Sequence, residues 1–118
     1  MQTIIIAPVI PQPPTPPIIP SVKEVVIYNA VSTEKASDNY FRIENTDENQ
    51  PITLLIFDEM GLKVYESNHY QQNGEYFIGY PNIKGMIGSK RLAGTYFYVV
   101  TYYFKGQQET KKGFLYVR

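Results

Sequence analysis

The sequence predicts an all-β fold, an antiparallel β-sandwich of about seven strands preceded by an extended Pro-rich linker. The segment RLAGTYFYVVTYYF, Arg91 to Phe104, carries β-branched or aromatic residues on both faces, as a long central strand does. Eleven tyrosines and six phenylalanines, with no tryptophan, suit strands and wet sheet surfaces. Short apolar runs separated by turn residues recur along the chain, whereas no helix and no internal repeat stands out.

The first 21 residues are predicted to form a linker, and residues 22–118 a folded domain. Seven of the nine prolines lie between Pro8 and Pro20, and proline favours extended polyproline geometry. At about 3.1 Å per residue, Ala7 to Pro20 would span roughly 40 Å. The segment lacks the basic start and the long apolar run of a signal peptide or a membrane span. We expect a spacer behind a passenger domain of a longer protein; a ligand for an SH3-like partner is the alternative.

The first two strands follow this linker. Lys23–Val31 is expected to form a single strand, because it is rich in β-branched residues. Tyr40–Asn45 follows and alternates between apolar and polar residues. This alternation predicts that Phe41 and Ile43 point into the core.

The remaining strands are predicted from apolar runs and the turns between them. Ile52–Asp58 is a continuous apolar run suited to the sandwich interior, and Leu62–Ser67 pairs back on it through a tight hairpin. Gly61 in that hairpin is free to take a positive φ. A weaker strand is expected over Glu75–Tyr80, followed by the long central strand, with Glu109–Arg118 as the last strand.

The composition indicates one globular domain without cofactor chemistry. The 118 residues are 43% hydrophobic and 19% charged, which is enough to bury a core. The absence of cysteine excludes disulfides, thiol catalysis, iron–sulfur clusters and cysteine zinc sites. Because the net charge is zero, the basic surface of a nucleic-acid-binding protein is missing. Acidic residues outnumber basic ones up to Glu66, and basic residues outnumber acidic ones after it. This indicates either a polar surface for a partner or a sandwich in which strands from the two halves interleave and mix their charges.

No residue pattern points to catalysis or metal binding. His69 is the single histidine and lies in a loop by composition, so it cannot build a histidine zinc site. A glycosidase needs two carboxylates across a cleft, but carboxylates near turns more often serve turn hydrogen bonds. The carboxylates in such positions are Asp38, Asp47, Glu48, Asp58 and Glu59. The sequence has no nucleophile-elbow serine and no phosphate-binding glycine loop. We expect no enzyme activity, no cofactor and no metal.

One loop suits a carbohydrate-binding or adhesive module, which is the alternative function. The stretch NHYQQNGEYF mixes amides with aromatic rings, the residue types that hydrogen-bond to sugars and stack on them. The residues in question are Tyr70, Gln71, Gln72, Asn73 and Tyr76. The other interpretation is that the amides fill a loop while the aromatic residues, with Phe77, cap the core.

Four motifs occur in a fixed order: YFRIEN, LLIFDEMGLKVYESNHYQQN, RLAGTYFYVVTYYF and KKGFLYVR. This series resembles the gliding motility-associated C-terminal domain, the type B sorting domain of the type IX secretion system in Bacteroidetes. The resemblance covers roughly Val26 to Arg118. It is carried by Phe41, Ile43, Asn45, Leu55, Ile56, Phe57, Gly61, Val64, Tyr65, Leu92, Gly94, Thr95, Tyr96, Phe97, Tyr98, Gly113, Tyr116 and Val117.

The chain departs from the family pattern at three places. Family members commonly carry an S-P-N-G-D-G-x-N-D loop before the first motif, where this chain reads VSTEKASDNYF and keeps only Asp38 and Asn39. If that loop binds Ca²⁺ in relatives, most of its oxygen ligands are absent here, so no metal is expected in the region 31–40. Met60 replaces a frequent aromatic residue, and Ala93 replaces a frequent proline.

The resemblance implies an Ig-like domain that acts as a secretion address. The parent protein, such as an adhesin or an enzyme, would pass through the periplasm and reach the cell surface or the medium. The implied partners are the type IX secretion machinery, a PorP/SprF-family outer-membrane barrel and the N-terminal passenger of the same chain. No transmembrane segment is expected. We expect the partner-binding residues to be Gly94, Thr95, Tyr96, Tyr98, Tyr102, Lys111, Lys112, Gly113 and Tyr116, with strand addition at an exposed edge as one mode of docking.

Overall fold

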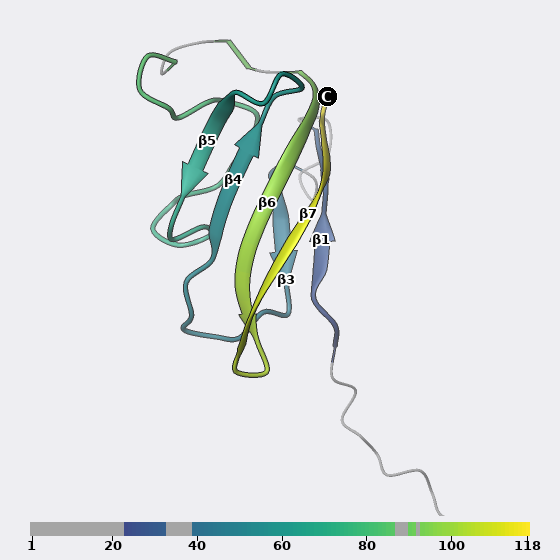
Figure 1. Cartoon of the computed structure of the whole chain (residues 1–118), viewed down its shortest axis with the longest axis vertical. Coiled ribbons are helices and arrows are strands. Elements are labelled where there is room, and N and C mark those ends of the chain that lie inside the picture. The colour runs from purple at the N-terminus through teal and green to yellow at the C-terminus, as the bar shows by residue number, and fades with distance from the viewer. Residues whose placement is uncertain (1–22, 33–38, 87–89, 92) are drawn as a thin grey trace, which may run out of the picture.

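The fold consists of two β-sheets, and the larger has the strand β6 (Gly94–Phe104) at its centre. The computed structural model describes residues 23–32, 39–86, 90–91 and 93–118, and its described residues contain no helix. The strands are β1 Val26–Tyr28, β2 Ala30–Val31, β3 Arg42–Glu44, β4 Thr53–Phe57, β5 Lys63–Ser67, β6 Gly94–Phe104 and β7 Gln107–Val117. The five-stranded sheet has the order β2-β7-β6-β4-β5, and a two-stranded sheet of β1 and β3 lies behind its β6–β7 side (Figure 1). The all-β sandwich is confirmed, and β7-β6-β4-β5 follows the G-F-C-C′ order of Ig domains.

Several predictions fall outside the described residues. They concern the Pro-rich linker, Asp38, Leu92 and most of the region 31–40. Within the described part of the chain, no segment forms a helix of the length and apolarity that crossing a membrane requires.

The β6–β7 hairpin runs the full length of the larger sheet. The two strands pair antiparallel in one continuous register, from the hairpin turn to Gly94 opposite Val117. Lys105 and Gly106 form the turn with φ values of 53° and 79°, the left-handed pair that matches the twist of the flanking strands. The predicted long central strand and the final strand are therefore confirmed.

The predicted first strand, Lys23–Val31, is instead two strands in different sheets. β1 pairs antiparallel with β3, whereas β2 pairs parallel with the end of β7. The break is at Asn29, whose side-chain amide donates to the Phe114 carbonyl and whose own carbonyl accepts from the Tyr116 N–H. The chain crosses from one sheet to the other at this residue because both of its polar groups are bonded to β7.

The segment Glu75–Tyr80 lies beside β3, but it does not form the predicted strand. One main-chain hydrogen bond joins it to that side of the sandwich, from the Phe41 N–H to the Phe77 carbonyl at 3.0 Å. Within the segment, Gly79 takes a φ of 109°, which an extended strand does not allow. The prediction recognised the segment's apolar residues and missed this interruption.

The β4–β5 hairpin agrees with the sequence. The two strands pair antiparallel, and Gly61 in the connection has a φ of 85°. The Asp58 carboxylate accepts the N–H groups of Met60 and Leu62 at 2.9 and 2.8 Å and so fixes the turn. β4 is not continuously interior, since its residues alternate between buried and half-buried. This alternation leaves Phe57 on the outer face.

The core lies between the two sheets and is rich in aromatic rings. Phe41 and Ile43 are both buried, as predicted. At the centre, Tyr70 donates its hydroxyl to the Phe41 carbonyl at 2.6 Å and accepts from the Phe77 N–H at 2.9 Å. Burial raises the pKa of Tyr70 above its usual value, partly offset by the Phe77 hydrogen bond. The other core side chains are Val31, Ile52, Leu54, Ile56, Val64, Tyr65, Tyr96, Tyr98, Val100, Tyr102, Leu115 and Val117.

Two side-chain amides close strand edges. The amide of Gln71 accepts from the Ile43 N–H at 2.7 Å and donates to the Ile43 carbonyl at 3.0 Å, on the outer side of β3. The amide of Asn82 does the same for Glu66 on the outer side of β5, at 2.9 and 2.8 Å. Each amide replaces a neighbouring strand at one residue, because it presents a donor and an acceptor as a peptide group does. These edges are therefore protected from pairing with another chain.

Candidate functional site

Three phenylalanines form a row across the outer face of the larger sheet. Phe57 of β4 stands opposite Phe97 of β6, and Phe97 stands opposite Phe114 of β7. The rings of Phe97 and Phe114 lie 4.6 Å apart between centroids, yet the two residues are 43% and 49% exposed. Large apolar residues clustered on a surface mark interaction sites more often than isolated ones do.

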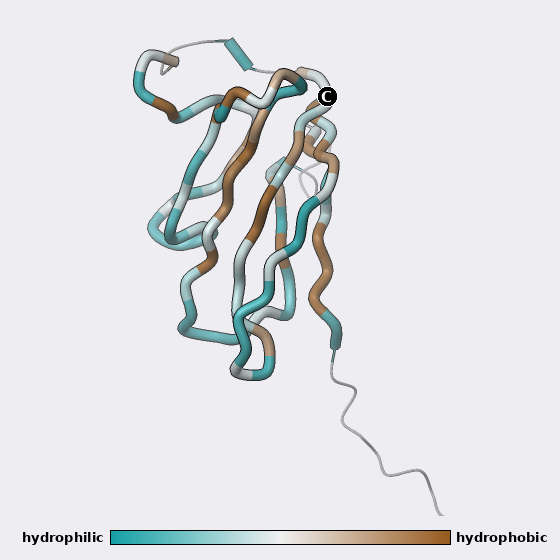
Figure 2. Tube along the Cα trace, viewed as in Figure 1, coloured by the Kyte–Doolittle hydropathy of each residue, from teal (hydrophilic) through white to brown (hydrophobic). Residues whose placement is uncertain are grey.

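The row borders an apolar hollow on the same face. The hollow has a volume of about 560 Å³ and is lined by Phe57, Gly61, Phe97, Tyr98, Val99, Lys112, Gly113 and Phe114. Among these residues Lys112 carries the one charged side chain, and it has the same outward orientation as Phe114 in the alternation of β7. The hydropathy of β7 changes along the strand, and Figure 2 shows that its half near the hairpin turn is hydrophilic. The hollow can therefore receive an apolar side chain of a partner, and the ammonium group of Lys112 lies at its rim.

Most of the predicted partner-binding residues are accessible. Gly94 and Thr95 are exposed at the start of β6, and Tyr116 is 41% exposed on the outer face beside Phe114. Lys112 is exposed on this face, and Lys111 is exposed on the opposite one. The structure thus brings Thr95, Lys112 and Tyr116 onto one surface.

Three predicted contact residues lie in the core instead. Tyr96, Tyr98 and Tyr102 alternate inward along β6 and are 8%, 9% and 2% exposed. Burial raises the pKa of all three hydroxyls; nearby carboxylates add to this for Tyr96 and Tyr102. Their burial corrects the expectation that these three side chains are exposed on the surface of the domain. Gly113 lies beneath the ring of Tyr98 and supports the fold.

The phenylalanine row lies outside the set of contact residues that the sequence predicts. Phe57 and Phe97 contribute to the family resemblance, and Phe114 lies in the last motif, but none of the three is an expected contact residue. The available signal was the two-residue period of β6, which places Phe97 on the face opposite Tyr96 and Tyr98. Knowing which face is buried requires the pairing with β4 and β7, which the sequence does not display.

The amide-rich loop serves mainly the interior. Tyr70 is fully buried, and both polar groups of the Gln71 side chain are bonded to Ile43. Gln72, Asn73 and Tyr76 remain exposed, and the Tyr76 ring meets Tyr40 edge-on at 4.9 Å. Two of the five residues of the carbohydrate-binding alternative therefore have structural roles.

Two of the carboxylates considered for chemistry are engaged in turns. Asp47 accepts the N–H groups of Lys105 and Gly106 at 2.9 and 2.7 Å, and Asp58 fixes the β4–β5 turn. His69 is exposed in its loop. In the described part of the chain, no three histidine, aspartate or glutamate side chains gather as metal ligands. These contacts account for the aspartates as structural residues.

Comparison with known proteins identifies the family. The family model of the CHU_C type IX secretion signal domain matches residues 25–117, which cover both sheets from just before β1 to the end of β7. No curated protein and no solved structure matches the chain at a significant level. The chain therefore belongs to the type IX secretion signal domain family, and it acts as a sorting signal for export across the outer membrane, with the type IX secretion machinery as its partner.

Proposed function

We propose that the folded domain docks to the secretion machinery through the outer face of its larger sheet. The observation that carries this proposal is the row of Phe57, Phe97 and Phe114, in which Phe97 and Phe114 are exposed and Phe57 is half-buried while neighbouring aromatic residues are buried. A partner that covers the row removes apolar surface from water and gains roughly 25 cal/mol per Å² before the costs of association. The adjacent hollow gives this contact a specific shape.

The domain acts without catalysis in this proposal. The roles of Asp47 and Asp58 in turns support this, because the same carboxylates are the ones that a hydrolytic site near the turns would use. The parent protein passes through the periplasm with the domain folded and ends at the surface or in the medium. A PorP/SprF-family barrel is the proposed outer-membrane component that receives it.

A reporter fusion tests the proposal. Residues 22–118 are attached to a periplasmically exported fluorescent protein in a host with the type IX system, and the reporter is measured outside the cell. We expect export that requires both the type IX system and the candidate barrel. Retention of a folded fusion in the periplasm would contradict the docking proposal.

Paired substitutions then locate the docking surface. The double variant Phe97→Thr with Phe114→Thr keeps β-branched residues on the strands while removing both rings. Its matched control replaces Tyr76 and Tyr80, which are 43% and 48% exposed outside the larger sheet, with threonine. We expect at least a tenfold loss of export for the phenylalanine pair and near-normal export for the tyrosine pair. Equal export of the two fusions would rule out this face.

A further inference from the structure

The edge of β7 is open over its half nearest the hairpin turn. β3 and β5 have their edges closed by Gln71 and Asn82, whereas β1 and β2 are only three and two residues long. β7 pairs along its whole length with β6, but on its other side β2 reaches only Tyr116 and Val117. Among the described residues, no strand pairs with the rest of β7 on this side, because the chain crosses from the other sheet only at Asn29.

The register identifies the main-chain groups on this side of β7. The Tyr116 N–H and the Phe114 carbonyl point toward the β2 side, since both are bonded to Asn29. Strand alternation gives Gln108, Thr110 and Lys112 the same direction. Among the described residues, no hydrogen bond reaches the main-chain groups of these three. They form a row of unsatisfied donors and acceptors to which an extended segment can add.

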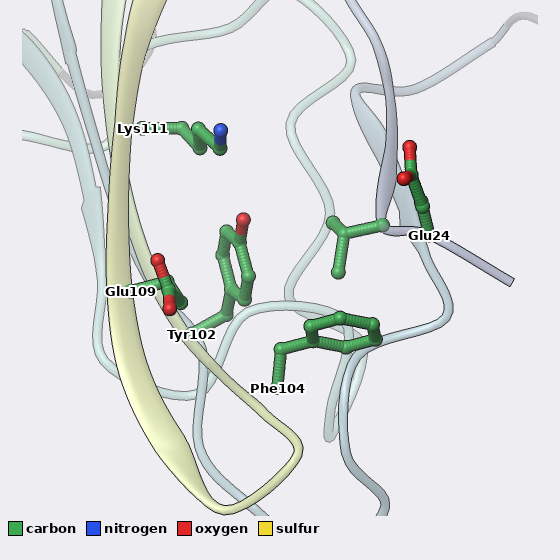
Figure 3. A pocket seen from close by; sticks show the side chains of 6 residues that line it. Glu24, Tyr102, Phe104, Glu109 and Lys111 are labelled. Carbon is green, nitrogen blue, oxygen red and sulfur yellow. The ribbon is translucent and has the colours of Figure 1, made fainter. Parts of the chain in front are cut away.

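The open edge lies between two hollows, one on each face of the sheet. On the outer face is the apolar hollow at Phe97, Lys112 and Phe114. On the inner face is a cavity of about 300 Å³ lined by Glu24, Val25, Tyr102, Phe104, Glu109 and Lys111. Figure 3 shows the Tyr102 ring standing between Glu109 and Lys111 of β7 on one side and the chain entering β1 on the other. A strand beside β7 would direct alternate side chains into these two hollows.

We propose, building on the proposed function, that a component of the secretion machinery adds an extended strand to β7 along Gln108–Lys112. The added strand carries a large apolar side chain that enters the outer hollow beside Phe97 and Phe114. It carries acidic side chains beside Lys111 and Lys112, and a polar side chain enters the inner cavity near the Tyr102 hydroxyl. Main-chain hydrogen bonds supply affinity in such strand addition, and the pockets for alternate side chains supply specificity.

Charge favours a foreign strand over a second copy of this domain. Lys111 and Lys112 are exposed on opposite faces of the edge, and neither forms an ion pair within the described part of the chain. If two β7 edges pair antiparallel about Thr110, Lys111 of each copy meets Glu109 of the other, but Lys112 meets the uncharged Gln108 and gains no opposite charge. An acidic strand gains from the same two lysines.

Proline substitution at the outward-facing positions provides a selective test. The Thr110 N–H points away from β6, so Thr110→Pro removes an edge donor and leaves the β6–β7 ladder complete. Thr110→Ala is the matched control, because it keeps the N–H and loses the same side-chain contact, the 3.1 Å approach to the Thr101 hydroxyl. In the reporter fusion we expect at least a tenfold loss of export for Thr110→Pro and near-normal export for Thr110→Ala. The thermal midpoint of each purified fusion shows that it is folded.

A charge variant tests the same edge without altering its main chain. Lys111→Glu with Lys112→Glu should lower export at least tenfold, and Lys84→Glu with Lys90→Glu, at two exposed lysines outside the larger sheet, should not. This pair decides the question if Thr110→Pro does not fold. Normal export of the Lys111 and Lys112 variant, or of a folded Thr110→Pro variant, would overturn the added strand.

The outcomes separate the two proposals. If the unsubstituted fusion is not exported by the type IX system, the proposed function fails. If it is exported and the edge variants are exported equally well, docking stands and strand addition at β7 fails. A purified domain that dimerises, with Thr110→Pro abolishing the dimer and leaving export intact, would assign the edge to a second copy instead.

Discussion

The phenol ring of Tyr98 lies directly against Gly113 on the neighbouring strand. A Cβ at Gly113 would come within 2.7 Å of the Tyr98 hydroxyl oxygen and 2.8 Å of a ring carbon. The two residues stand opposite each other in the β6–β7 register, and the ring packs inward against Phe41 at 5.0 Å between centroids. Glycine is therefore needed at this position of the last family motif, because any side chain there would clash with the ring of Tyr98.

Gly113→Ala should destabilise the domain by about 1–3 kcal/mol, because an added methyl group overpacks the site under Tyr98. Urea unfolding measures the loss. In a double-mutant cycle with Tyr98→Ala, the penalty of Gly113→Ala should largely disappear, since the ring that it strikes is gone. Additive effects of the two substitutions would show that the steric explanation is wrong.

Tyr70→Phe should cost about 2–3 kcal/mol of unfolding free energy. The substitution removes the hydroxyl that satisfies the Phe41 carbonyl and the Phe77 N–H, and it leaves both buried without a partner. Tyr76→Phe is the control, because its hydroxyl makes only a long contact of 3.4 Å at the surface. The same denaturant series should show almost no change for Tyr76→Phe. A similar loss in both variants would contradict the bridging role of Tyr70.

Asn82→Ala should expose the outer edge of β5. It removes both side-chain hydrogen bonds to Glu66, so we expect a loss of about 1–2 kcal/mol and a new tendency to self-associate. Light scattering at increasing concentration measures the association. Asn68→Ala, at an exposed position one residue after β5, should leave the domain monomeric. Unchanged behaviour of Asn82→Ala would mean that the amide does not protect the edge.

Alkaline pH should unfold the domain through its buried tyrosines. Burial, aided by the charge of Glu75, raises the pKa of Tyr65 to about 12, and burial also raises the pKa of Tyr70. A raised folded-state pKa stabilises the fold fully below the unfolded value near 10, and this contribution is lost as the pH rises from 10 towards 12. The thermal midpoint should therefore fall over that range. Tyr65→Phe should make this fall of the thermal midpoint shallower. If the dependence on pH does not change in that variant, groups other than Tyr65 cause the fall.

The sequence was most informative where local pattern and tertiary structure agree. The alternation in Tyr40–Asn45 places Phe41 and Ile43 correctly in the core, and the long aromatic run predicts the central strand. Turn chemistry was equally clear at Gly61, which takes the positive φ that the hairpin sequence predicts. In each case the information lies within a few residues of the element that it determines.

Predictions failed where distant residues decide the outcome. Asn29 divides the first strand because its bonding partners are on β7, 85 residues further along. Gln71 occupies the outer edge of β3 at Ile43, beside the segment where an additional strand was expected. The expected contact residues divide for the same reason. Thr95 and Tyr116 lie at the surface, whereas Tyr98 is buried and Phe97 is exposed, because the pairing of β6 decides which of its faces is covered.

The position of β7 makes folding of the whole domain depend on its last strand. The strand that comes last in the domain is an interior member of the sheet, joined to β6 over its whole length and to β2 from the beginning of the domain. A ribosome that stalls before residue 107 leaves β6 without this partner and the core without Leu115 and Val117. A chain that stops there can complete neither the larger sheet nor the core, so it carries no folded sorting domain.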